Sequence, residues 1–222
     1  VQLDDSLKVV PEIAHSWEID SLGKTYTFYL RQDVQFHYSP SFGEKKTRNV
    51  VATDFAYSFD RLTDPKVGSP GGWVMQQVES YQALNDSVFR IRLKQAFPAF
   101  ISLLSMRYCA VVPKEVIEDS QHDFRKHPVG TGPFKFKAWE EDVKLVLRRN
   151  PHYFEKDEEG QQLPYLEAIA ISFLPDIQSE FMLFSKGKFD FLNSLDPSYK
   201  DELLTPSGKL QEKYSKQIRI QK

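Results

Sequence analysis

The stretch Thr25-Tyr26-Thr27-Phe28-Tyr29-Leu30-Arg31 alternates between buried-type and water-tolerant side chains. Successive side chains of an extended chain point to opposite faces, so one face would carry Tyr26, Phe28 and Leu30. Residues 16–19 precede it, and residues 20–24 between them contain the Asp, Ser and Gly typical of tight connections. The pattern therefore predicts an antiparallel hairpin with one buried face.

Residues 52–62 carry the spacing of a helix. Its apolar side chains recur three and four positions apart, at Phe55, Phe59 and Leu62. Thr53 is a candidate N-cap, and Asp64-Pro65 predicts the end of the helix because the residue before a proline disfavours the helical conformation. We expect this apolar face to be mostly buried.

The remaining segments alternate between strands and helices without strict βαβ order. Further strands are predicted over 81–84, 88–93, 108–112, 134–139, 143–149, 166–174, 189–192 and 217–221. Further helices are predicted over 73–78, 98–105, 113–118, 176–186 and 197–204, and the fourth of these would turn Ile177, Phe181 and Phe184 inward. The fold class that follows is α/β, with a mixed sheet of substantial antiparallel content.

The composition indicates an ordinary folded protein. Of 222 residues, 41% are hydrophobic, 14% aromatic and 27% charged, which excludes a disordered chain. The formal net charge of −2 and the lack of a basic run argue against nucleic acid or an anionic membrane as partner. No stretch approaches the roughly 18 apolar residues of a membrane span. The one cysteine, Cys109, excludes an internal disulfide, and its apolar surroundings predict a buried, unreactive thiol.

No combination of residues indicates catalysis. Gly130-Thr131-Gly132 is similar to half of a dinucleotide-binding fingerprint, but Pro133 and a predicted strand follow it where a helix is needed. The five histidines form no i, i+4 pair, and adjacent carboxylates fall in predicted turns. We therefore expect no enzyme, no metal and no cofactor. Trp73, after Gly71 and Gly72, is either a stacking platform for a ligand or a partly buried core tryptophan.

Six segments in collinear order resemble motifs of the family 5 extracytoplasmic solute-binding proteins, the peptide, dipeptide and nickel receptors of ABC importers. They are VPEIAHSW (10–17), TYTFYLRQDVQFH (25–37), ATDFAYSFDRL (52–62), HPVGTGPF (127–134), RNPHYF (149–154) and FSKGKFD (184–190). The sequence departs from the family in the longer loop over 38–49 and in Val51, which stands where a helix-capping Thr is expected.

The resemblance implies a type II periplasmic-binding-protein-like fold. Residues 1–127 would form the smaller subdomain of lobe one and residues 128–222 part of the core sheet of that lobe up to the hinge, with the second lobe absent. Strand edges left open near Ile218 and Ile220 would allow self-association.

The resemblance also implies a function. The protein would be the substrate-binding component of an ABC importer, capturing an oligopeptide or dipeptide between two lobes and delivering it to the membrane permease. Its place would be periplasmic or otherwise extracytoplasmic, free or lipid-anchored. Gly71, Gly72 and Trp73 would border the cleft, and Gly130, Thr131 and Gly132 would lie near the hinge side. The alternatives are a nickel chelate or sugar as ligand, or a cell-envelope interaction module without transport.

Overall fold

The computed structural model describes residues 1–121, 123–193, 196–215 and 218–219. The chain divides into two compact units. The first comprises Val1–Ala138 and Val146–Ala170, and the second comprises Trp139–Leu145 and Ile171–Lys222. The expected division into subdomains at residue 128 stays a prediction.

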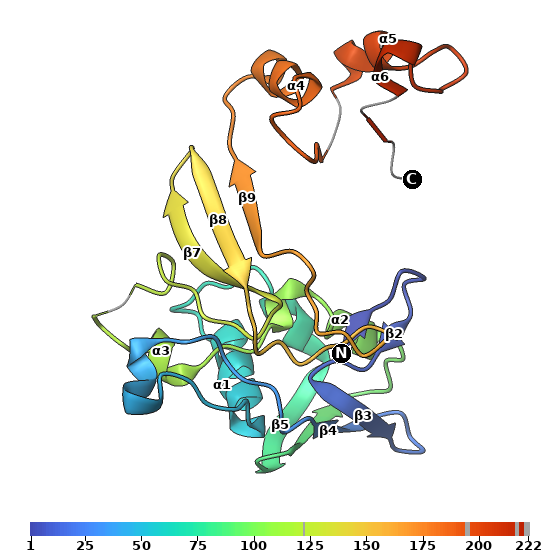
Figure 1. The fold of residues 1–222 in the computed structure, drawn as a ribbon. Helices are drawn as coiled ribbons and strands as arrows, with labels where there is room; N and C mark the ends of the chain where they lie inside the picture. The colour runs from blue at the N-terminus through green and yellow to red at the C-terminus, as the bar shows by residue number, and fades with distance from the viewer. Residues whose placement is uncertain (122, 194–195, 216–217, 220–222) are drawn as a thin grey trace. The chain divides into compact units, whose positions relative to one another are not determined.

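A four-stranded antiparallel sheet forms the floor of the first unit (Figure 1). Its strands, in spatial order, are β3 (Ala14–Ile19), β4 (Thr25–Leu30), β6 (Val88–Leu93) and β5 (Val78–Asn85). Phe28 of β4 lies opposite Trp17 on one side and Phe89 on the other. Tyr26, Phe28 and Leu30 are all buried, so the predicted hairpin and its inward face are confirmed.

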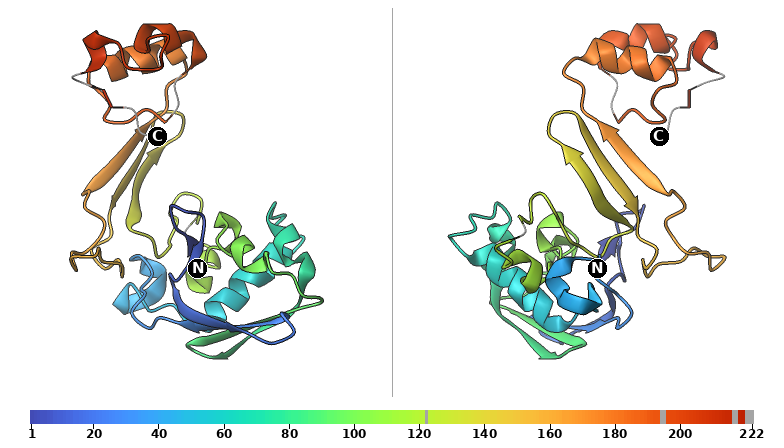
Figure 2. Two further views of the ribbon diagram at one scale, coloured as in Figure 1. Left: turned by 90° about the vertical axis from the view of Figure 1, so that its right-hand side faces the viewer. Right: turned by 60° about the vertical axis from the view of Figure 1, so that its left-hand side comes forward.

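Helix α1 (Ala52–Thr63) packs on one face of this sheet, as Figure 2 shows from two directions. Phe59 and Leu62 are buried and Phe55 is partly buried, which confirms the predicted apolar face. The main core cluster lies between the helix and the sheet. The helix ends at Thr63 before Asp64, as predicted.

The predicted cap of α1 is wrong. Thr53 lies inside the first turn and is exposed, and the N-cap position belongs to Val51. The carboxylate of Asp54 accepts a hydrogen bond from the backbone N–H of Val51 at 2.9 Å. Asp54 also forms a bidentate pair with Arg48, at 2.7 and 2.8 Å. The acidic residue in the third helical position therefore satisfies the helix start, because Val51 has no polar side chain to do so.

The first unit also contains short strands and helices that lie before, between and after the strands of this sheet. They are β1 (Gln2–Leu3), β2 (Val9–Val10), η1 (Pro40–Lys45), η2 (Gly72–Gln77), α2 (Phe100–Leu103), η3 (Arg107–Cys109) and α3 (Lys114–Ile117). The strand expected over 108–112 is wrong: its first two residues lie in η3, and the rest pairs with no strand among the described residues. Cys109 and Val111 are nevertheless buried, so the apolar run reports burial and not strand pairing.

A three-stranded sheet follows, in the order β7 (Phe134–Glu140), β8 (Lys144–Arg149) and β9 (Ala168–Ser172). The first two strands confirm the predicted hairpin. Arg149 N–H donates to the carbonyl of Glu167, and Phe173 N–H donates to that of Val143, each at 2.9 Å. Residue numbers fall along β8 while they rise along β9 from one pair to the other, so the two strands are antiparallel.

The helices of the second unit are α4 (Ile177–Ser185), η4 (Pro197–Tyr199), α5 (Lys200–Leu203) and α6 (Glu212–Ser215). Phe181 of α4 is buried and stacks on Tyr199 with ring centroids 4.2 Å apart. Ile177 is 49% exposed, so its predicted inward position is wrong. The strand expected over 189–192 does not form, and most of the one expected over 217–221 lies outside the described residues.

Candidate functional site

A cavity of about 410 Å³ lies within the first unit, between the four-stranded sheet, α1 and the segment around η3. Its apolar wall is built from strands and helix by Phe28, Leu30, Phe55, Phe59, Phe89 and Ile91. Its polar lining includes Glu12, Ser105 and Arg107, together with the loop Gly130–Gly132. Mostly apolar walls with a few polar groups are typical of small-ligand sites.

Two buried side chains hold the Gly130–Gly132 loop in place. Nε2 of His37 lies 2.9 Å from the carbonyl oxygen of Gly132, and Nδ2 of Asn150 donates to the same oxygen at 3.0 Å. The backbone N–H of His37 donates to the carbonyl of Gly130 at 2.8 Å. Both ends of the loop are therefore anchored to segments far away in the sequence.

The middle of the loop makes fewer hydrogen bonds than its ends. Within the part of the chain that the structure describes, the N–H groups of Thr131 and Gly132 donate no hydrogen bond. A Cβ atom placed on Gly130 or Gly132 would meet nothing within 4 Å. Two main-chain donors thus lie on a loop that lines the cavity, with open space beside the glycines of that loop. Such donors can pair with the main-chain carbonyls of an extended ligand.

Burial controls the ionisation of the groups around the cavity. Burial lowers the pKa of His37, the Gly132 carbonyl raises it and Lys135 lowers it, which keeps the ring neutral at pH 7. Burial raises the pKa of Glu12 above its usual range and that of the Cys109 thiol to about 11. Cys109 is therefore an inert core thiol, as predicted.

The other predicted site residues lie elsewhere in the first unit, and none of them lines this cavity. A Cβ atom on Gly71 would lie 2.4 Å from Cβ of Tyr108, and one on Gly72 would lie 2.8 Å from the carbonyl oxygen of Leu62. Close packing thus accounts for both glycines. Trp73 is 46% exposed and is not a core residue. Contact of these three residues with a ligand stays a prediction.

Sequence reasoning missed His37 and Asn150. Both lie inside segments that carry the family resemblance, but nothing in the sequence distinguishes a histidine or an asparagine that hydrogen-bonds a distant loop from one that does not. Among the described residues, no group of three or more His, Cys, Asp and Glu side chains could hold a metal ion. No helix of the described chain has the length and apolar character needed to cross a membrane.

The family described as "Bacterial extracellular solute-binding proteins, family 5 Middle" matches residues 8–221. Among curated relatives, the di/tripeptide-binding protein 1 of Pseudomonas aeruginosa is 29% identical over 169 residues, covering 68% of this chain and 31% of that protein. The dipeptide-binding protein of Escherichia coli is 24% identical, over 86% of this chain and 37% of the relative.

Solved structures agree with this match. The periplasmic binding protein DppA of Helicobacter pylori, in complex with the peptide STSA, superposes with a TM-score of 0.79 at 25% identity, over 91% of this chain and 41% of that one. NikZ of Campylobacter jejuni, in complex with Ni(L-His), gives a TM-score of 0.70 at 26% identity, over 85% of this chain and 36% of that one.

The chain spans only about a third of the length of these relatives: 31% of the Pseudomonas protein and 37% of the Escherichia protein. Over that span it has the mixed α/β fold, with antiparallel sheets, of part of a lobe of the type II periplasmic binding proteins. With residues 8–221 matched by the family, the chain belongs to the family 5 bacterial extracellular solute-binding proteins.

Proposed function

We propose that the protein is the substrate-binding component of an ABC import system, which captures a peptide between two lobes and delivers it to a membrane permease. The observation that carries this proposal is the pair of main-chain donors at Thr131 and Gly132 on the wall of an apolar cavity. We place the protein outside the cytoplasm, free or held by a lipid anchor, in keeping with its family.

The chemistry of this wall suits a peptide better than a ligand with one fixed side chain. Hydrogen bonds to a ligand's main chain are the same for every amino acid, so they give affinity without sequence preference. The apolar residues beside the loop can accept varied side chains. The relatives named as di/tripeptide-binding and dipeptide-binding proteins, and the neighbour with a bound peptide, support the same ligand class.

Other family members define the alternatives that a test must include. One relative is named a heme-binding protein and another a glutathione-binding protein, and one structural neighbour holds Ni(L-His). The test is calorimetric titration of the full-length protein with di-, tri- and tetrapeptides, and in parallel with glutathione, heme and the nickel–histidine chelate. We expect micromolar or tighter binding of peptides. Binding of only one of the other ligands would overturn the peptide assignment.

A matched pair of variants connects the binding to the cavity. Ala110 is exposed and lines the cavity, whereas Ala99 is exposed and does not line it. A tryptophan at position 110 would fill space that the ligand needs, so Ala110→Trp should weaken peptide binding at least about tenfold. Ala99→Trp should leave binding unchanged. Equal effects of the two variants would show that the ligand lies elsewhere.

A further inference from the structure

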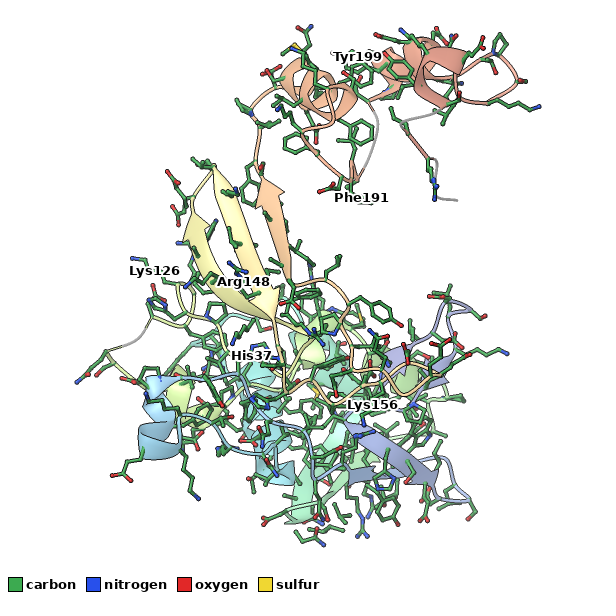
Figure 3. The ribbon with its side chains drawn as sticks, viewed as in Figure 1. His37, Lys126, Arg148, Lys156, Phe191 and Tyr199 are labelled. Carbon is green, nitrogen blue, oxygen red and sulfur yellow. The ribbon has the colours of Figure 1, made fainter. Side chains whose placement is uncertain are left out.

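We propose that His37 and Asn150 are positioning residues, which hold the Gly130–Gly132 loop in its ligand-binding shape, and that His37 does so only as a neutral ring. The inference rests on the proposed function, since it assigns to these residues the shaping of that site. It draws together three motif segments that are far apart in the sequence, around residues 37, 130 and 150. Figure 3 labels His37.

The hydrogen bonds around His37 select one state of its ring. The carbonyl oxygen of Gly132, 2.9 Å from Nε2, can only accept a hydrogen bond, so Nε2 must carry a proton. The backbone N–H of Gly130 points at Nδ1 with a separation of 3.4 Å, so Nδ1 must offer its lone pair. Only the neutral tautomer with the proton on Nε2 satisfies both partners. His37 also donates its own N–H to Gly130, which makes the pairing with this glycine reciprocal.

Asn150 fixes the Gly132 end of the loop by hydrogen bonds. Its amide Nδ2 donates to the Gly132 oxygen at 3.0 Å, and its backbone N–H donates to Pro133 at 2.8 Å. Its Oδ1 accepts from the N–H of His152, which fixes the orientation of the side chain. The His37 and Asn150 side chains are 8% and 5% exposed, so water competes little for these bonds. Thr131 is left as the residue between two fixed ends.

A proton on Nδ1 would break this arrangement, because the ring would then present a donor to the Gly130 N–H. Lys135 of β7 is the charged group that acts on His37, and it opposes protonation further. Among the described residues, nearby titratable groups include Tyr38, the next residue in the chain, and His152, whose ring lies 5.8 Å from that of Tyr38. Neither side chain is a carboxylate, so neither supplies an acidic partner for a protonated His37.

The sign of the pH effect follows from the lowered pKa of His37. As the pH falls below about 6.5, the usual value for an unfolded chain, the unfolded state takes up the proton first. The contribution of His37 is therefore fully present above about pH 6.5 and is lost as the pH falls toward the lower pKa of the folded state. The loop itself should lose its shape only as the folded ring takes up the proton, at the lower pKa of the folded state.

The first experiment needs no ligand. In the protein labelled with ¹⁵N-histidine, NMR should show His37 protonated on Nε2 and not on Nδ1 at pH 7.5. Hydrogen exchange of the Gly130 amide should speed up, after correction for intrinsic exchange, as the pH is lowered from 7.5 through the titration of His37. His152→Gln, a control at an exposed histidine, should show the same His37 protonation and the same pH dependence of Gly130 exchange as the wild type. Two results would overturn the proposal, even if no His37 variant folds. One is a ring protonated on Nδ1, and the other is a Gly130 amide exchange rate that does not change as His37 titrates.

The second experiment adds the ligand. Peptide affinity of the wild type and of His152→Gln should drop as the pH is lowered through the His37 titration seen by NMR, and by about tenfold once the ring is protonated, the loss expected for about one hydrogen bond. His37→Gln, whose amide keeps a donor toward Gly132 but takes up no proton in this pH range, should show no such drop. A drop of the same size in His37→Gln would overturn the positioning role. If no peptide binds the wild type while Gly130 exchange follows His37, the proposed function fails and the loop geometry stands.

Discussion

Replacing Phe59 with alanine tests the packing of α1 on the sheet. The side chain is 3% exposed and makes two edge-to-face contacts, with Tyr81 at 5.5 Å and with Phe89 at 5.6 Å between ring centroids. Removing a buried phenylalanine costs about 3–5 kcal/mol of unfolding free energy. Phe59 also lines the cavity, so the void that its removal leaves would join an existing one. Because neighbours cannot easily close such a void, we expect a loss in the upper half of that range.

The measurement is urea unfolding at pH 7.5, followed by circular dichroism and evaluated for the transition that involves the first unit. Thr53→Ala is the matched control, because Thr53 lies on the same helix, is exposed and does not cap it. We expect a change within about 0.5 kcal/mol for the control. A loss below about 1 kcal/mol for Phe59→Ala would refute the packing argument. A loss of 1 kcal/mol or more for Thr53→Ala would refute the conclusion that Asp54, and not Thr53, satisfies the start of the helix.

Three further predictions concern single positions of the first unit. Asp54→Ala removes both the acceptor for the start of α1 and one partner of the partly buried pair with Arg48, so we expect urea unfolding to show a loss of about 2–4 kcal/mol. Gly71→Ala forces a Cβ to within 2.4 Å of Tyr108 and should lower the free energy of unfolding by about 1–3 kcal/mol. Gly130→Ala, with open space beside it, should change that free energy by less than about 0.5 kcal/mol. Equal melting temperatures of the two variants would contradict this. With its pKa raised to about 11, folded Cys109 should resist iodoacetamide for hours at pH 8 and react within minutes in urea, as mass spectrometry would show.

Periodic patterns in the sequence predicted the elements that depend on nearest neighbours. Alternation in residues 25–31 and the spacing of Phe55, Phe59 and Leu62 identified β4 and α1 before any contact was known. The reason is physical: a strand or an amphipathic helix with one buried face must repeat its apolar side chains with the period of its backbone. The six collinear motifs carried the family assignment in the same way, because they can be read along the chain.

Tertiary structure alone decided features that depend on residues distant in the chain or on the absence of a partner. Asp54 satisfies the start of α1, and its partner Arg48 is held in turn by Glu115, which lies 67 residues further along the chain. The apolar run over 108–112 predicted burial correctly and strand pairing wrongly, because pairing needs a neighbouring strand edge and burial does not.

The candidate site shows the same division. The Gly130–Gly132 loop was visible in the sequence, but the side chains that fix it, His37 and Asn150, come from segments 93 and 18 residues away along the chain, as counted between hydrogen-bonded partners. Hydrogen-bond partners at such separations leave no periodic trace in a single sequence, since each is one residue that meets another only after the chain has folded. The family, the main strands and helix α1, and the position of the loop can therefore be read from the sequence. Only the folded chain decided which side chains hold that loop and which protonation state of His37 lets them do so.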